Sequence, residues 1–185
     1  MKSAQTFPEY LTRYLFAMEY CGKKRVLDAG SKDGYGARLI SYVTRNIDLA
    51  DICETYLNIA KRRGGLDKNA KFFVNDFEKE FPDGEWDVII AFEVIEHLAN
   101  PDFFLDNVNK HLSREGVFIF SVPHIMPSSL HKQLFDKESI ITLISKYFTL
   151  MEFYEQTTKP ISNRFLYKKL KVYVGVAVKK PPKML

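Results

Sequence analysis

The stretch VLDAGSKDGYG, residues 26–36, decides the fold class of this 185-residue chain. A short apolar run ends in a carboxylate, Asp28, and leads at once into glycines, which let a backbone turn sharply and approach a ligand closely. A helix that follows such a turn presents free N–H groups at its N-terminus. Taken alone, a glycine turn between a strand and a helix can be purely structural, so its meaning depends on its surroundings.

Short apolar runs alternate with segments of helical periodicity on both sides of this stretch. In chain order they read KRVLDAG, ARLISYVTR, NIDLAD, ETYLNIAKRR, KFFVND, WDVIIAF, PDFFLDNVNKHL and GVFIFSV. This alternation is typical of βαβα units and predicts a mainly parallel sheet with helices on both faces. Before the last of these runs we expect a tight connector at Ser113–Gly116, with Gly116 able to take a positive φ.

The two ends of the chain extend this pattern. Residues 1–22 carry apolar side chains at helical spacing and close with Gly22, which predicts an N-terminal helix. Beyond GVFIFSV we predict a helix at 136–147 and strands at 148–156 and 170–179, close enough in sequence to pair antiparallel at the sheet edge. The sequence therefore predicts a doubly wound α/β fold with a seven-stranded, mainly parallel sheet.

The composition fits one globular domain spanning residues 1–185. Hydrophobic residues make up 46% of the chain and charged residues 27%, and no apolar run is long enough to cross a bilayer. The N-terminus lacks the apolar core of an export signal, and the two cysteines have no paired spacing. We expect a cytoplasmic protein with reduced thiols and without membrane insertion.

Charge and aromatic content make nucleic acid an unfavourable partner. The net charge is only +4, and much of the excess lies on lysines near the C-terminus, which we interpret as a solvated strand end and a tail at 180–185. Aromatic residues make up 14% of the chain, but most fall in strand or helix patterns that bury them. The oligomeric state stays open.

Three predicted strands end in a carboxylate. They are the strands that end at Asp28, Asp51 and Asp76. In an open parallel sheet, ligands bind beyond the carboxyl ends of the strands, where an aspartate can accept the hydroxyls of a ribose or an amino group of a base. Each aspartate alone could be a turn or helix cap, but three in order are harder to explain by capping.

With these motifs the chain resembles the class I S-adenosylmethionine-dependent methyltransferases. The resemblance covers about Arg13 to Gln156, with RYLFA, VLDAGSKDGYG, DICETYLNIAK, WDVIIAFEVIEHLANPDFFL and FSVP as its most distinctive parts. It points to the group with an EVIEHL segment, similar to methyltransferases of types 11 and 23 and to those of glycan gene clusters. It implies a Rossmann-like fold and S-adenosylmethionine as the cofactor.

The resemblance also implies a set of cofactor-binding residues. The turn after the first strand would hold the amino-acid end of the cofactor, Asp51 the ribose, and Asp76 with Phe77 the adenine, while Arg13 could pair with the cofactor carboxylate. Lys32 departs from the pattern, since the family usually has a glycine there, and we expect its side chain to point to solvent. The implied cofactor-binding set is Arg13, Asp28, Ala29, Gly30, Ser31, Gly34, Asp51, Ile52, Asp76, Phe77, Phe92 and Glu93.

The EVIEHL segment follows the fourth strand, where the methyl group of the cofactor would emerge. Methyl transfer from a sulfonium needs alignment, and a base when the acceptor carries a proton. His97 is the predicted base, although a structural histidine is an equal alternative. We assign no metal ligands, but Glu93, Glu96 and His97, with His124 or His131, resemble the magnesium site of small-RNA 2′-O-methyltransferases, and that alternative stays open.

Residues 123–134 break regular structure and are predicted to form a lid over the acceptor. By similarity to the glycan-cluster enzymes, His131 would face the acceptor and is the second predicted catalytic residue, with a loop histidine as the alternative. The expected reaction is O-methylation of a small-molecule or carrier-linked acceptor, with a sugar or glycan precursor as the expected acceptor. The alternatives are a quinone-like small-molecule methyltransferase, an RNA 2′-O-methyltransferase, and a non-catalytic cofactor-binding partner subunit.

Overall fold

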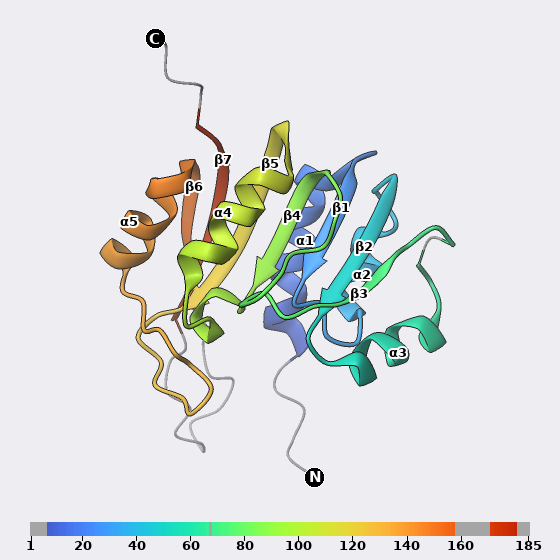
Figure 1. Cartoon of the computed structure of the whole chain (residues 1–185), viewed down its shortest axis with the longest axis horizontal. Helices are drawn as coiled ribbons and strands as arrows, with labels where there is room; N and C mark the ends of the chain where they lie inside the picture. The colour runs from blue at the N-terminus through green and yellow to red at the C-terminus, as the bar shows by residue number, and fades with distance from the viewer. Residues whose placement is uncertain (1–6, 67, 158–170, 181–185) are drawn as a thin grey trace.

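A computed structural model of the chain describes residues 7–66, 68–157 and 171–180 (Figure 1). Helices and strands alternate along most of it, as the sequence predicts. In chain order the elements are α1 (Phe7–Cys21), β1 (Arg25–Ala29), α2 (Tyr35–Ile40), β2 (Asn46–Asp51), α3 (Glu54–Arg63), β3 (Phe72–Val74), β4 (Trp86–Phe92), the 3₁₀ turn η1 (Ile95–His97), α4 (Pro101–His111), β5 (Leu112–Pro123), α5 (Lys137–Tyr147), β6 (Phe148–Thr157) and β7 (Lys171–Lys179).

The seven strands form one sheet in the order β3-β2-β1-β4-β5-β7-β6. The pairs among β1 to β5 are parallel, whereas β7 is antiparallel to both β5 and β6. The predicted mainly parallel sheet with antiparallel pairing at one edge is confirmed. The antiparallel strand is β7, which lies between β5 and β6, so β6 is the edge strand of the sheet.

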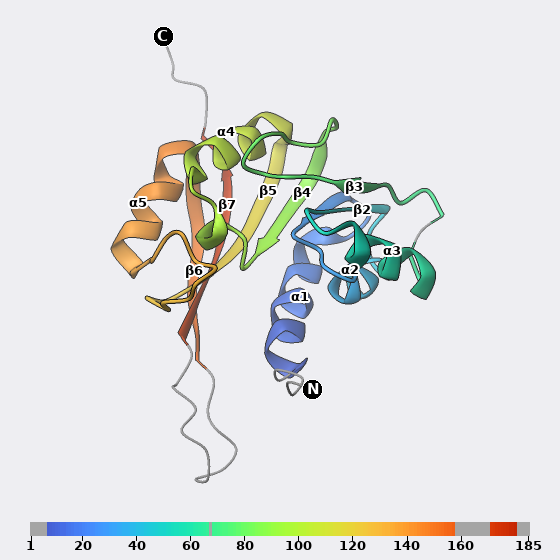
Figure 2. The ribbon, with the colours of Figure 1, turned by 60° about the horizontal axis from the view of Figure 1, so that its bottom comes forward.

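Helices cover both faces of the sheet (Figures 1 and 2). Alternate residues of a strand point to opposite faces, and neighbouring residues of β1 accordingly enter different cores. Leu27 belongs to the core under α4 and α5, whereas Val26 belongs to the core with α1, α2 and α3. All these side chains are out of contact with solvent, so both faces of the sheet are buried as a doubly wound fold requires.

The connection into β5 differs from the prediction. β5 begins at Leu112, immediately after α4, so Ser113–Gly116 is part of the strand instead of a separate connector. The β4–β5 register shifts between Trp86 and Val88, which accommodates the early start. A Cβ on Gly116 would lie 2.6 Å from Cγ of Leu112, and Gly116 is not among the residues with positive φ. Its role is to leave room for that buried leucine.

Side-chain caps fix the starts of the two helices on the α4–α5 face. Asn100 accepts the N–H of Phe103 at the start of α4, where Pro101 takes the first helical position. Asp136 and Ser139 form a reciprocal capping box at the start of α5. The capping box starts α5 where the sequence predicts it and ends the irregular segment that precedes this helix.

The strand order reverses between β1 and β4, which are neighbours although β2 and β3 separate them in sequence. The chain therefore leaves these two strands toward opposite sides, and the residues after them face each other across the carboxyl edge of the sheet. Of the predicted tail, residues 181–185 lie outside the described residues. Among residues 7–66, 68–157 and 171–180, none of the helices combines the length and apolarity that a bilayer crossing requires.

Candidate active site

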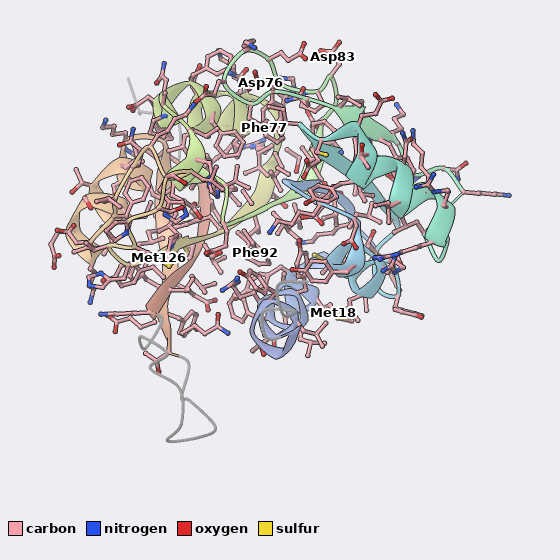
Figure 3. The ribbon with its side chains drawn as sticks, turned by 90° about the horizontal axis from the view of Figure 1, so that it is seen from below. Met18, Asp76, Phe77, Asp83, Phe92 and Met126 are labelled. Atoms are coloured by element: carbon pink, nitrogen blue, oxygen red, sulfur yellow. The ribbon has the colours of Figure 1, made fainter. Side chains whose placement is uncertain are left out.

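The carboxyl edge of the sheet gathers most of the predicted site residues. Figure 3 looks onto this edge, with Phe92 near the middle, Asp76 and Phe77 above it and Met126 to its left. Phe92 is the last residue of β4 and is 7% exposed. The edge joins the turn after β1, the end of β2 and the segment after β4.

The turn after β1 is built for close approach. Gly30 has φ +79°, and a Cβ there would lie 2.5 Å from Cγ2 of Val94 in the segment after β4. Its N–H and that of Ser31 both donate to the Ala50 carbonyl at the end of β2, at 2.8 and 3.1 Å. Gly34, with φ +70°, lets the chain pass close to α3. Glycine at 30 and 34 is thus required by both conformation and space.

Lys32 occupies the same turn in a left-handed conformation, with φ +49°. Its side chain is exposed, and its Nζ lies 5.6 Å from the centre of the Tyr10 ring. The expectation that this lysine points outward is confirmed. Lys32 restricts the backbone conformations open to the turn, but its exposed side chain does not occupy the space inside the turn.

Asp51 closes β2 with its carboxylate held by two backbone groups. Oδ2 accepts the Lys32 N–H at 2.8 Å and Oδ1 accepts the Cys53 N–H at 2.8 Å. The side chain is 7% exposed. These two bonds fix the carboxylate between the turn after β1 and the start of α3, where the second lone pair of each oxygen remains available to a ligand hydroxyl. The next residue, Ile52, is 68% exposed at this edge.

Asp28 is completely buried beneath the turn. The Tyr14 hydroxyl of α1 donates to its two oxygens, at 3.1 and 3.2 Å. Burial raises the pKa of the Asp28 carboxyl to about 7, the Tyr14 hydrogen bond opposes that rise, and the charge of Asp51 adds to it. Burial and the Asp28 carboxylate also raise the pKa of Tyr14. Ala29, which follows, is 1% exposed and ends β1.

Arg13 reaches the same edge from α1. Its Nη1 donates to Oε1 of Gln156 at 3.0 Å, and its guanidinium lies 4.7 Å from the ring centre of Tyr10 and 5.9 Å from that of Phe92. Its Nε is buried and has no hydrogen-bond partner among the described residues. The predicted pairing of Arg13 with a cofactor carboxylate stays a prediction.

Asp76 and Phe77 follow β3 and are engaged within the protein. The Asp76 carboxylate accepts the Glu78 N–H at 3.1 Å and pairs with Lys79 at 2.8 Å, which lowers its pKa. Phe77 is 6% exposed and packs against Phe81 and Phe104. The turn-capping role that the sequence left open for Asp76 is therefore present, and the adenine contact stays a prediction.

Glu93 begins the EVIEHL segment in a strained conformation, with φ +55°. Its N–H donates to the Ser121 carbonyl at 3.1 Å, and the Ser121 hydroxyl donates to Oε1 of Glu93 at 2.9 Å. Ser121 lies on the neighbouring strand β5 and is completely buried. Sequence reasoning missed its role, although it belongs to the FSVP motif.

Glu96, His97 and His131 come together beyond the end of β4. The two imidazole centres lie 4.8 Å apart, and Nε2 of His97 lies 3.9 Å from Oε1 of Glu96. Glu96 is 1% exposed; burial and the nearby charge of Glu93 raise the pKa of its carboxyl to about 8. His124 is not part of this group, and its Nδ1 is bonded to the Tyr173 hydroxyl at 2.8 Å.

The segment predicted as a lid lies against η1. The Glu96 carbonyl accepts the N–H groups of Lys132 and Gln133, at 2.8 and 3.0 Å, and Nδ1 of His97 is bonded to the Leu130 carbonyl at 2.9 Å. These hydrogen bonds hold His131 beside the EVIEHL segment. Opening of this segment over the acceptor stays a prediction.

The arrangement of a glycine turn, three strand-end aspartates and a histidine cluster at one sheet edge agrees with the comparison against protein families. A protein-family model described as "Methyltransferase domain" matches residues 5–158 of the sequence. This chain belongs to the methyltransferase-domain family. The cofactor that the sequence motifs imply for it is S-adenosylmethionine, which the names of curated relatives also give.

Curated relatives of this methyltransferase domain include a "Probable S-adenosylmethionine-dependent methyltransferase" of Mycobacterium tuberculosis, 34% identical over 104 residues. The match covers 56% of this chain and 37% of the relative. A malonyl-[acyl-carrier protein] O-methyltransferase of Bacillus cereus is 31% identical over 99 residues, which are 52% of this chain and 36% of that protein. The chain thus matches well under half the length of these relatives.

Solved structures confirm the fold of the domain. The N-methyltransferase NodS of Bradyrhizobium japonicum, bound to S-adenosyl-L-homocysteine, superposes with a TM-score of 0.76 at 15% identity, covering 94% of this chain and 87% of that one. The [4+2]-cyclase SpnF superposes with a TM-score of 0.77 at 14% identity, covering 95% of this chain and 84% of that one. Since one neighbour is named as a cyclase, the fold alone does not fix the reaction.

The residues present fit the cofactor. The Ser31 hydroxyl in the turn and Nε of Arg13 are buried polar atoms without hydrogen-bond partners among the described residues, which marks places for ligand polar groups. A Cβ at Gly30 would close the turn against Val94. Asp28, Ser31 and Arg13 would hold the amino-acid end and Asp51 the ribose, while the bound cofactor would supply an electrophilic methyl group.

Proposed function

We propose that this methyltransferase domain transfers the methyl group of S-adenosylmethionine to an oxygen atom of a small-molecule or carrier-linked acceptor. The observation that carries the proposal is the meeting of Glu96, His97 and His131 beyond the end of β4. A hydroxyl acceptor is a weak nucleophile until it loses its proton, so a group that removes or weakens that proton must lie beside it. Two imidazoles and a buried carboxylate at this edge meet that need.

The chain's own residues divide the work in this proposal. Phe92 and Glu93 at the end of β4 would contact the cofactor where its methyl group emerges, with Glu93 held by Ser121. An imidazole nitrogen can take up a proton and release it again, which suits His97 and His131 to proton transfer. The segment after β5 would exclude water while it rests on η1.

Two observations favour an acceptor that is attached to a carrier. Residues Ile125, Leu130 and Leu134 of the segment that bears His131 are 50%, 69% and 51% exposed, so this segment offers apolar surface beside the predicted reaction centre. Relatives named as malonyl-[acyl-carrier protein] O-methyltransferases match half of the chain. The proposed acceptor is a sugar or glycan precursor on such a carrier, with a carrier-bound carboxylate as the second candidate.

The test is methyl transfer with purified protein, measured as S-adenosylhomocysteine formed. The panel holds free and carrier-linked sugars, malonyl-acyl carrier protein, a hydroxylated quinone precursor, an amino sugar as the amine acceptor, and an RNA duplex. We expect turnover with an oxygen acceptor of the first kinds. Turnover with amine acceptors or RNA alone would refute the proposal, and cofactor binding without turnover would favour a non-catalytic subunit.

The His97→Ala variant tests the role of the cluster. We expect it to lower kcat at least tenfold, in line with the usual contribution of proton transfer, while affinity for S-adenosylhomocysteine stays within about twofold. His111→Ala is the matched control, because Nδ1 of His111 is also bonded to a backbone carbonyl, that of Gly84, but at the opposite edge of the sheet. Full activity of His97→Ala would remove His97 from catalysis.

A further inference from the structure

Three potential metal ligands converge beside the predicted acceptor position. Glu96 and His97 come from η1, and His131 comes from the segment after β5, more than thirty residues later in the chain. One ligand atom from each lies within 4.8 Å of the other two. Because one member reaches the group from another element, local sequence geometry alone does not explain the cluster.

Both imidazoles have their Nδ1 atoms occupied in the same way. Nδ1 of His97 is 2.9 Å from the Leu130 carbonyl oxygen, and Nδ1 of His131 is 2.7 Å from that of Met126. A carbonyl can only accept, so Nδ1 carries the hydrogen in each ring and Nε2 keeps a free lone pair. Bonding of the far ring nitrogen to a carbonyl is the arrangement that orients histidine ligands in metalloproteins.

The carboxylate of Glu96 has no donor of its own. The side chain is 1% exposed, and neither oxygen has a hydrogen-bond partner among the described residues. Its separation of 3.9 Å from Nε2 of His97 is too long for a hydrogen bond. Buried polar groups are normally satisfied, and with Glu96 ionised and both imidazoles neutral three acceptors meet here. One cation would satisfy all three at once.

The kind of ligand decides the kind of cation. Two imidazole nitrogens and one carboxylate oxygen suit Zn²⁺ and its first-row neighbours, whereas Mg²⁺ prefers oxygen ligands alone. The second carboxylate of the segment, Glu93, is bonded to Ser121 and is not one of the three converging groups, although its charge acts on Glu96. The arrangement is therefore unlike an oxygen-rich magnesium site.

We propose that Glu96, His97 and His131 bind one divalent transition-metal ion, with Zn²⁺ as the best fit, and leave at least one coordination position open. The existence of the ion-binding site does not depend on the proposed function, whereas the role of its open coordination position rests on that function. An acceptor oxygen there would bind to the ion, which as a Lewis acid would promote loss of the acceptor's proton to solvent, and the two imidazoles would act on the acceptor through the ion.

The binding test uses the chelator-treated full chain without cofactor or acceptor. Zn²⁺ is titrated by calorimetry, and Co²⁺ is titrated with its visible absorption as the readout of ligand geometry. We expect one ion per chain and no competition from millimolar Mg²⁺. His131→Ala and Glu96→Gln should each weaken Zn²⁺ binding at least tenfold. The matched control is His124→Ala, which removes an imidazole of the same segment that is bonded to Tyr173, and it should leave the affinity unchanged.

The outcomes separate this proposal from the methyl transfer itself. Failure of the folded chain to bind Zn²⁺ or Co²⁺, binding that His131→Ala leaves intact, or equal competition by Mg²⁺ would each overturn the site. If Glu96→Gln does not fold, His131→Ala carries the test, because His131 lies in a largely exposed segment outside helices and strands. Methyl transfer by the metal-free chain would leave the function standing and overturn the role of the ion.

Discussion

At the scale of single residues, Asp51 is the side chain whose removal should weaken cofactor binding most directly. The Asp51→Ala variant removes the proposed ribose contact and also the acceptor for the N–H groups of Lys32 and Cys53. We expect affinity for S-adenosylhomocysteine to fall by about 2 kcal/mol, the scale of a charge-assisted hydrogen-bond pair. Calorimetric titration measures it.

The control for that experiment is Asp106→Ala, which removes a half-exposed carboxylate that pairs with Lys110 on α4. It should leave cofactor affinity within experimental error, since surface ion pairs contribute little. Equal affinities for wild type and Asp51→Ala would exclude Asp51 from the site.

Lys32 allows a second residue-scale prediction. Its φ of +49° is a conformation that L-residues adopt at a cost and glycine adopts freely. We expect Lys32→Gly to raise the free energy of unfolding by up to about 1 kcal/mol, because relief of strain exceeds the loss of an exposed contact with Tyr10. Denaturant unfolding measures this change.

Lys23→Gly is the matched variant, since Lys23 has φ +58° in a turn away from the cofactor loop. Both variants should be stabilised, and cofactor affinity should stay unchanged in Lys23→Gly. A lower stability of Lys32→Gly would show that the lysine side chain contributes more than its backbone strain costs.

The aspartates of the site could be predicted because each one ends an apolar run, and the carboxyl ends of parallel strands share an edge. The pairs that complete the site could not be predicted. Tyr14 bonds to Asp28, Ser121 to Glu93, and His131 joins Glu96, each across elements whose packing the sequence does not state. For the same reason the sequence could not choose between His124 and His131.

At the scale of elements, the position of α1 depends on one glycine of α2. A Cβ on Gly36 would lie 2.1 to 2.4 Å from ring atoms of Tyr14, whose hydroxyl bonds to Asp28. We expect Gly36→Ala to lower the free energy of unfolding by about 1 to 3 kcal/mol, the usual cost of overpacking, and to weaken cofactor binding by displacing Tyr14. Thermal unfolding and calorimetry measure the two effects.

Gly22→Ala provides the comparison for α1. A Cβ at Gly22 would meet no atom within 4 Å, so this substitution should be nearly neutral. A neutral Gly36→Ala would mean that α1 can move away from α2 without cost, and the link from Gly36 through Tyr14 to Asp28 would fail.

The boundaries of elements were predictable where capping residues mark them and were wrong where packing decides. α5 begins after Asp136, as its capping pattern suggests, and β6 and β7 fall within a residue or two of their predicted ranges. The error at Ser113–Gly116 arose because a polar Ser-Arg-Glu-Gly run reads as a turn. Pairing of Leu112 with Trp86 of β4 draws these residues into the strand instead.

At the scale of the whole molecule, the carboxyl edge lowers the stability of the fold. Asp28 is buried with a pKa of about 7, and Glu96 is buried without a hydrogen-bonded partner. Neither arrangement benefits the cofactor-free protein, since apolar residues at these positions would avoid the cost of desolvation. Such costs are expected where a site is prepared for charged ligands, here the cofactor and the proposed cation.

The pH dependence of stability should expose that cost. The folded state raises the Asp28 pKa from an ordinary 3.8 to about 7, so between those pH values the folded chain holds a proton that the unfolded chain has lost. The contribution of this proton to the free energy of unfolding is complete below pH 4, falls as pH rises, and is gone above pH 7, a loss of up to about 4 kcal/mol. Asp28→Asn stays neutral throughout, so its unfolding free energy relative to wild type should increase over that range.

Urea unfolding of both proteins from pH 4 to pH 8 measures this difference and cancels the titration of groups that the two share. Saturating S-adenosylhomocysteine should shrink the difference above pH 7, because its ammonium group would stabilise the ionised carboxylate of wild type and finds no charge in Asp28→Asn. A difference that stays constant with pH would show that Asp28 is ionised throughout in the folded protein. In that case its pairing with Tyr14 would outweigh its burial.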